Sequence, residues 1–214
     1  MRRRRKGLHF GREKKKINVV LIKEILIWVV EILIVNLIAF VLVTFIGMRT
    51  SVLGQSMAPT LSNGEEVLVN RFKYIIFDPK PDDIIVFLPN GNEKSHYYIK
   101  RVIAVEGDTV QIKDGVVYVN GEVYEDDFDS QAITDTGIAD EEITVGEDEF
   151  FVLGDNRNNS EDSRYANIGN VKKEYIYGEA WFIVSPWKDF GFIGSGSSTD
   201  NESETYTESE TTEE

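Results

Sequence analysis

The feature that most constrains this 214-residue chain is a long apolar run near its amino terminus. Residues 25–46 contain only three polar side chains, those of Glu31, Asn36 and Thr44. A helix of these 22 residues, rising about 1.5 Å per residue, is long enough to cross a hydrocarbon core of about 30 Å. A removable targeting peptide would have a shorter apolar region and a small-residue cleavage site, and the run has neither. It therefore predicts a transmembrane anchor that stays in the chain.

The flank of this run predicts its orientation. Residues 1–46 carry ten Lys and Arg against three Glu, and the positive-inside rule places such a flank in the cytoplasm and the chain after Gly47 outside. The alternative, a buried core helix, fits poorly because residues 1–24 offer nothing for it to pack against. Glu31 is costly in lipid unless it is protonated or partnered, so it either marks a helix–helix contact or lies within reach of water.

The composition of the remaining chain excludes several functions. Residues 47–194 carry 27 acidic and 13 basic side chains, which argues against a nucleic-acid partner. The absence of cysteine excludes disulfides and thiol chemistry. His9 and His96 lie far apart in sequence, which argues against a zinc site, so no metal or other cofactor is expected. Residues 195–214, with seven acids and no base, bury too little apolar surface to fold and are expected to be disordered.

The body of the chain is expected to be mostly β, an antiparallel domain built as sheet on sheet or as a folded-over barrel. Asp114-Gly115 and Asn120-Gly121 favour tight hairpin turns with positive φ, which predicts a meander over residues 109–125. Residues 122–149 are acid-rich and weakly patterned, and are expected to form a solvated surface excursion. The predicted strands, all β-branched or aromatic runs between turn residues, are 66–71, 84–88, 97–105, 109–113, 116–119, 149–153 and 176–184.

The strand predicted at 97–105 carries a lysine on an otherwise apolar face. Alternation along the strand places Lys100 with Tyr98, Val102 and Ala104. Apolar neighbours desolvate an ammonium group and lower its pKa, so the neutral amine becomes accessible as a base. The alternative is that Lys100 extends to water at a sheet edge.

Two polar loops carry further candidate chemistry. Ser56 stands between Gly54 and Pro59, where a turn can project its hydroxyl into a cleft and leave its own N–H for a developing oxyanion. An ordinary turn serine is the alternative. Residues 154–164 are dense in Asp, Asn, Ser and Arg, which fits a solvated loop or a calcium loop, although the EF-hand pattern lacks its central Gly and its terminal Glu.

Together, three segments resemble the sequence boxes of the type I signal peptidases, the membrane-bound Ser/Lys endopeptidases that remove signal peptides from exported proteins. They are Ser56-Met57-Ala58-Pro59-Thr60-Leu61, Lys100-Arg101-Val102-Ile103 with Gly107-Asp108, and residues 154–164. The resemblance covers about residues 25–185. Lysine rather than histidine at position 100 indicates the bacterial branch of the family.

The resemblance implies a role for each matching residue. Ser56 would be the nucleophile, Lys100 the general base, and Ser160 the residue that orients the Lys100 amine by a hydrogen bond. The Ser56 N–H would bind the oxyanion, and because Gly54 replaces a serine found in some members, the second donor must come from the backbone at Gly54 or be absent. Polar residues would hold the site, with Asp162 pairing Arg164, and apolar ones would line pockets for small residues at substrate positions −1 and −3. The first set is Asp155, Arg157, Asp162 and Arg164, and the second is Val52, Ile99 and Met57.

The expected organisation is a basic cytoplasmic segment (1–24), an anchor (25–46), an extracytoplasmic catalytic β domain (47–194) and an acidic tail (195–214). The expected partners are secretory preproteins and the bilayer of the bacterial cell membrane. Residues 74–77 and 181–192 either rest on that bilayer or belong to the core. A self-cleaving regulator would carry a basic DNA-binding module where the anchor stands. A non-enzymatic exported scaffold would not naturally keep Ser56, Lys100 and Ser160.

Overall fold

A computed structural model describes residues 19–46, 48–126 and 131–193. The expected disorder of residues 195–214 and the basic residues before Val19 lie outside the described residues. The chain divides into two units, residues 1–42 and 43–214, and each is described by itself.

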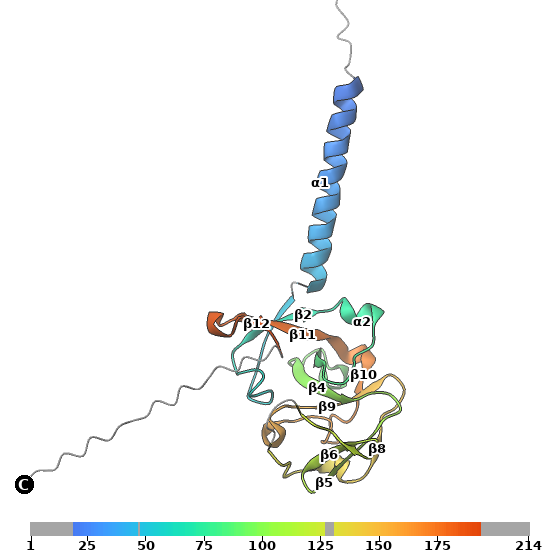
Figure 1. Ribbon diagram of the computed structural model, residues 1–214, viewed down its shortest axis with the longest axis vertical. Coiled ribbons are helices and arrows are strands. Elements are labelled where there is room, and N and C mark those ends of the chain that lie inside the picture. The colour runs from blue at the N-terminus through green and yellow to red at the C-terminus, as the bar shows by residue number, and fades with distance from the viewer. Residues whose placement is uncertain (1–18, 47, 127–130, 194–214) are drawn as a thin grey trace, which may run out of the picture. The chain divides into compact units, whose positions relative to one another are not determined.

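The described part of the first unit belongs to one apolar helix, α1 (Val19–Ile46), whose last four residues are counted with the second unit (Figure 1). It begins before the predicted residue 25, because Val19 to Ile22 extend the apolar run past Lys23 and Glu24. Within the described residues, α1 is the one helix long and apolar enough to span a membrane, over Val20–Val41. Asn36 Nδ2 donates to the Ile32 carbonyl over 2.8 Å, which satisfies part of this polar side chain inside the helix.

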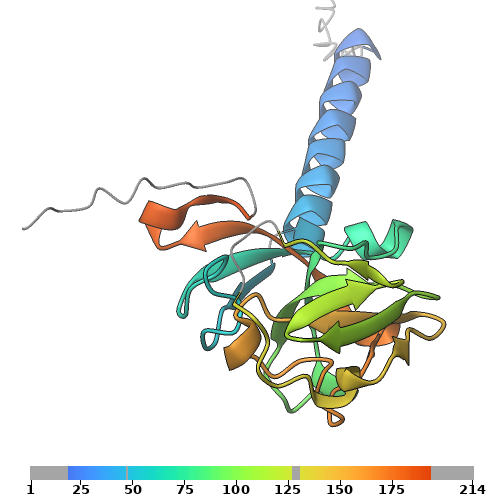
Figure 2. The same cartoon turned by 60° about the horizontal axis from the view of Figure 1, so that its bottom comes forward.

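The second unit is built from two antiparallel sheets, which confirms the expected fold class. In Figures 1 and 2 the smaller sheet lies at the opposite end of this unit from β12. The larger sheet has the order β1 (Met48–Ser51), β2 (Glu66–Asn70), β11 (Ile176–Ser185), β3 (Ile84–Phe87), β4 (Tyr98–Ala104), β9 (Glu149–Leu153) and β10 (Val171–Lys172), with β12 (Gly191–Phe192) paired to β11. The smaller sheet has the order β7 (Glu122–Val123), β6 (Val116–Val119), β5 (Thr109–Lys113) and β8 (Ile143–Thr144).

The helical segments of this unit are short. They comprise the one-turn helix α2 (Lys73–Ile76) and the 3₁₀ turns η1 (Pro89–Gly91), η2 (Gly137–Asp140), η3 (Arg157–Asn159), η4 (Lys173–Tyr175) and η5 (Trp187–Asp189).

The seven predicted strands all form, each within two residues of its expected ends. The predicted meander is also confirmed, because Asp114 and Gly115 have φ of 51° and 78°, and Asn120 and Gly121 have φ of 54° and 81°. Both residues of each turn therefore adopt the positive φ that suits the twist of a hairpin. The third strand of this meander is β7. The sequence did not reveal β1, β8, β10 and β12, which have only two to four residues and too little alternation to recognise.

Strand β4 lies at the centre of the packing. Its Ile99, Val102 and Ile103 each belong to a different cluster of buried apolar side chains. The first of these clusters also takes in Met57 and Leu61 from the loop that carries Ser56. The hydrophobic core thus fixes both segments that hold the candidate catalytic residues.

The acid-rich stretch 122–149 is not the solvated excursion that its composition predicted. Ile133, Ala139 and Val145 are buried in the core cluster beside the smaller sheet. The Val145 N–H donates to the Asp108 carbonyl over 2.8 Å and fastens the stretch to the turn before β5. Single apolar residues spaced among acids follow neither the helix nor the strand period, so the pattern gave no sign of this packing.

Candidate active site

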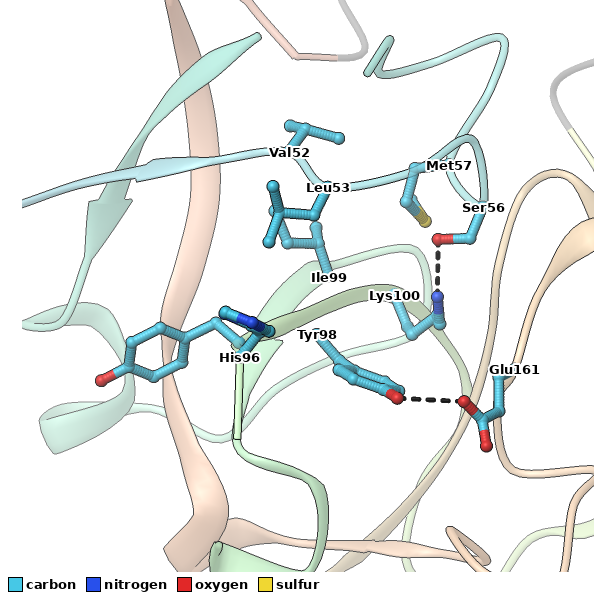
Figure 3. A pocket seen from close by; sticks show the side chains of 10 residues that line it. Val52, Leu53, Ser56, Met57, His96, Tyr98, Ile99, Lys100 and Glu161 are labelled. Carbon is cyan, nitrogen blue, oxygen red and sulfur yellow. Dashed lines mark hydrogen bonds between the residues drawn. The ribbon is translucent and has the colours of Figure 1, made fainter. Parts of the chain in front are cut away.

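Lys100 lies in the middle of β4, with β3 and β9 on either side, and is only 4% exposed to solvent. The alternative that it extends to water at a sheet edge is therefore wrong. Lys100 Nζ lies 2.7 Å from Ser56 Oγ and donates a hydrogen bond to it (Figure 3). A neutral amine could accept the hydroxyl proton across this same short contact.

Burial lowers the pKa of Lys100 to about 8. Desolvation is the largest cause, and the Arg164 charge acts in the same direction, while the carboxylates of Asp162, Glu161 and Asp155 oppose it. With a pKa near 8, roughly one amine in ten is neutral at pH 7, whereas an ordinary lysine near 10.4 has well under one in a thousand. The site can therefore supply a free amine at physiological pH.

Hydrogen bonds hold the loop that carries Ser56 at its two ends and at its centre. The Val52 N–H donates to the Glu65 carbonyl over 2.8 Å. Near the serine, the Asn156 N–H donates to the Ser56 carbonyl over 3.0 Å, and Asn156 Nδ2 donates to the Gln55 carbonyl over 3.1 Å. Asn156 is a positioning residue that the sequence analysis did not single out.

Gly54 does not supply the second oxyanion donor in this structure. Its N–H donates to Asn63 Oδ1 over 2.9 Å and is thereby occupied within the loop. Its φ of +85° favours glycine for conformational reasons. Among the described residues, the Ser56 N–H donates to no other group. Of the two predicted oxyanion donors, it is therefore the one that is free to bind an oxyanion.

Asp155 links the segments that carry the two candidate catalytic residues. Its fully buried carboxylate accepts bonds from Arg101 Nε and Nη2, at 2.8 and 2.7 Å, and from Thr60 Oγ1 at 2.5 Å. Arg101 follows Lys100 on β4, and Thr60 belongs to the Ser56 loop. The sequence analysis named Asp155 as a polar residue of the site but did not pair it with Arg101 or Thr60.

The predicted pair of Asp162 and Arg164 is confirmed. Arg164 Nε and Nη2 donate to the two Asp162 oxygens over 2.8 and 2.9 Å, and the two side chains are 0% and 1% exposed. Arg164 also donates to the Asp135 carbonyl over 2.9 Å, and Arg157 pairs with Asp126. Arginines occupy Asp155 and Asp162, two of the three carboxylates of residues 154–164, which argues against the calcium-loop alternative. No cluster of metal-binding side chains occurs among the described residues.

Ser160 does not make the hydrogen bond to the Lys100 amine that the resemblance implied. Ser160 is buried, and its Oγ has no hydrogen-bond partner within the described part of the chain. The Lys100 amine is directed to Ser56 instead. Ser160 Oγ packs against Gly154, where an added Cβ would overlap both this oxygen and the Ser56 carbonyl. Glycine at position 154 thus allows the two polar loops to approach each other.

A cleft of about 240 Å³ opens over the Ser56–Lys100 pair (Figure 3). Val52, Ile99 and Met57 line it, where the resemblance placed them. The sequence analysis did not assign its other lining residues to a cleft, namely Leu53, His96, Tyr97, Tyr98 and Glu161. A β domain with a serine hydroxyl against a buried lysine amine, beside a small apolar cleft, has the features of a serine hydrolase that uses lysine as its base.

Comparison with known proteins gives the family. The signal peptidase family, peptidase S26, matches residues 25–187, and the chain belongs to it. It is 35% identical to signal peptidase I P of Bacillus subtilis subsp. natto over 184 residues, which are 83% of this chain and 95% of that protein. It is 31% identical to signal peptidase IB of Staphylococcus aureus over 194 residues, covering 84% and 99% of the two chains. A crystal structure of a signal peptidase I from Enterococcus faecalis is 30% identical and covers 48% of this chain and 97% of that one, with a TM-score of 0.37.

Proposed function

We propose that this signal peptidase I cleaves signal peptides from secretory preproteins with Ser56 as nucleophile and Lys100 as general base. The observation that carries the assignment is the 2.7 Å contact between the Ser56 hydroxyl and the buried Lys100 amine. The lowered pKa of Lys100, to about 8, supports its role as a base. The family provides the reaction, and the position of this pair in the cleft supports the residues proposed to perform it.

The reaction follows from this contact. Neutral Lys100 takes the Ser56 hydroxyl proton as Oγ attacks the scissile carbonyl, and the Ser56 N–H stabilises the oxyanion. The Lys100 ammonium then gives the proton to the leaving amine, so the C–N bond breaks and an ester to Ser56 remains. In the second half Lys100 removes a proton from water, the hydroxide attacks the ester, and Ser56 Oγ recovers the proton as the signal peptide leaves.

The function is tested by incubating the purified full-length chain, in detergent, with a secretory precursor. Mass spectrometry of the product gives the cleaved bond. We expect one cut that leaves the mature protein, and no product from Ser56→Ala. An uncut precursor with the wild-type chain, or an active Ser56→Ala variant, would contradict the proposal.

The cleavage rate should depend on pH through the Lys100 amine. Below its pKa of about 8 the protonated form cannot act as a base, so kcat/KM should rise about tenfold per pH unit and level off above the pKa. The measurement is a profile of kcat/KM from about pH 6 to pH 9.5 on a substrate without titrating side chains near the scissile bond. A flat profile, or a rise only near pH 10, would contradict the role of Lys100.

Substrate choice should follow from the small apolar cleft. If Val52, Ile99 and Met57 shape the pockets for positions −1 and −3, a bulky residue at −1 overfills them at a cost of about 1–3 kcal/mol. Replacing Ala by Leu at −1 should therefore lower kcat/KM by about tenfold or more. Equal cleavage of the two peptides would show that these side chains do not line the −1 pocket.

For topology we propose one membrane pass by α1, with the basic amino terminus in the cytoplasm and the β unit outside. The boundaries follow the predicted organisation, with a basic segment up to residue 24, the anchor over 25–46, the catalytic unit over 47–194 and an acidic tail. The apolar span of α1 and the positive flank support this arrangement. The exposed side chains of Ile75, Phe77 and Trp187 support contact of the β unit with the bilayer surface rather than a core role.

Protease added to intact spheroplasts is the test of this orientation. The β unit should be digested without lysis, because it would lie on the accessible side. A cytoplasmic marker protein, protected until lysis, is the control. Survival of the β unit until the cells are lysed would refute the orientation.

A further inference from the structure

Glu161 is a charged residue of the cleft that the proposed reaction does not use. It follows the buried Ser160 and lines the same cleft as Ser56 and Lys100. Figure 3 shows it on one side of Lys100, with Val52, Leu53 and His96 on the other. Glu161 is an acidic residue, so it gives this end of the cleft a formal negative charge.

Two hydrogen bonds hold this carboxylate in place. Tyr98 Oη, on β4, donates to one oxygen over 3.0 Å, and Asn167 Nδ2 donates to the other over 2.7 Å. Both donors are neutral, and no ion pair of Glu161 occurs in the described residues. The charge is therefore fixed in position and not neutralised, and its influence on Lys100 shows that its field reaches the reacting groups.

The direction of the substrate follows from the apolar end of the cleft. Small residues at −1 and −3 would occupy the end formed by Val52 and Ile99, so the chain beyond the scissile bond continues past Ser56 toward the Glu161 side (Figure 3). From this arrangement we infer that Glu161 determines charge specificity, and favours a basic side chain at the first or second residue of the mature protein. This inference rests on the proposed function.

The expected effect is moderate, because Glu161 is exposed to solvent. An exposed charge pair changes binding by about two- to fivefold at low salt. Since Lys is attracted and Glu is repelled, their ratio of kcat/KM at one position should approach about tenfold. The preference should weaken as salt is added.

The test uses matched peptides that carry Lys or Glu at position +1 or +2, cleaved by the full-length chain at neutral pH and low salt. The readout is the Lys-to-Glu ratio of kcat/KM within each variant, which cancels any general loss of activity. Glu161→Gln should reduce the ratio toward one, and Glu161→Lys should reverse it. Glu141→Gln is the control, because it removes the same charge from an exposed site outside the cleft and should leave the ratio unchanged.

A ratio that is the same in wild type, Glu161→Gln and Glu161→Lys at both positions would overturn the inference, as would an equal change in Glu141→Gln. Binding can be measured without cleavage on the inactive Ser56→Ala variant and on the Ser56→Ala/Glu161→Gln double variant. The readout is then the ratio of the dissociation constants of the Lys and Glu peptides. If no peptide is cut, the proposed function fails, while these binding ratios still decide whether Glu161 selects charge.

Discussion

Replacing Lys100 by arginine is expected to abolish signal-peptide cleavage as completely as replacing it by alanine. A guanidinium with a pKa above about 12 keeps its proton in a protein, so it cannot take one from Ser56. Loss of the base should lower kcat by at least about 10³-fold, measured on a precursor peptide with folding verified by circular dichroism. Combining Ser56→Ala with Lys100→Ala should cost no more than either change alone, because nucleophile and base act as a unit.

The matched control is Lys172→Arg, at an exposed lysine on β10, which should cleave at the wild-type rate. If Lys100 acted only through its positive charge, as a clamp on the substrate, arginine would retain much of the activity. An active and folded Lys100→Arg variant would therefore remove Lys100 from the role of base.

Removing the carboxylate of Asp162 is expected to be the most destabilising single change in the polar loops. Asp162→Ala leaves the Arg164 cation, which is 1% exposed at its side chain, without its bidentate partner. An unpaired buried charge costs about 3–5 kcal/mol, so the free energy of unfolding in urea should fall by about that amount.

Asp78→Ala is the comparison, because Asp78 is 72% exposed at its side chain and pairs with Lys173 at the surface. Its loss should change the free energy of unfolding by less than about 0.5 kcal/mol. A change below about 1 kcal/mol for Asp162→Ala would show that the loop rearranges and hydrates Arg164, and that this ion pair does not hold the site.

Local patterns in the sequence predicted most of the fold. The β-branched run around Lys100 and the two turns at Asp114-Gly115 and Asn120-Gly121 are short-range signals that the structure follows. The same strand pattern gave the apolar environment of Lys100, and hence the direction of its pKa shift. The approach of Lys100 to Ser56, 44 residues apart, could be expected only from the family resemblance.

Apart from the Asp162–Arg164 pair, whose members are two residues apart, the partners of the buried charges could not be predicted, because they lie far away in sequence. Asp155 meets Arg101 and Thr60 across 54 and 95 residues, and Arg157 meets Asp126 across 31. Asp126 lies in the acid-rich stretch, where one carboxylate among many gives no sign of its partner. The occupied N–H of Gly54 and the unpartnered Ser160 hydroxyl depend on loop conformation, which residue types alone do not determine.

The central claim is that Lys100 is neutral enough at physiological pH to deprotonate Ser56. Its most direct test is an NMR titration of the lysine side-chain amines in the intact chain, with the Lys100 signal identified by its absence from Lys100→Ala. The account predicts a pKa of about 8 for this amine, well below that of an ordinary lysine side chain. A Lys100 signal that titrates with the other lysines would contradict it.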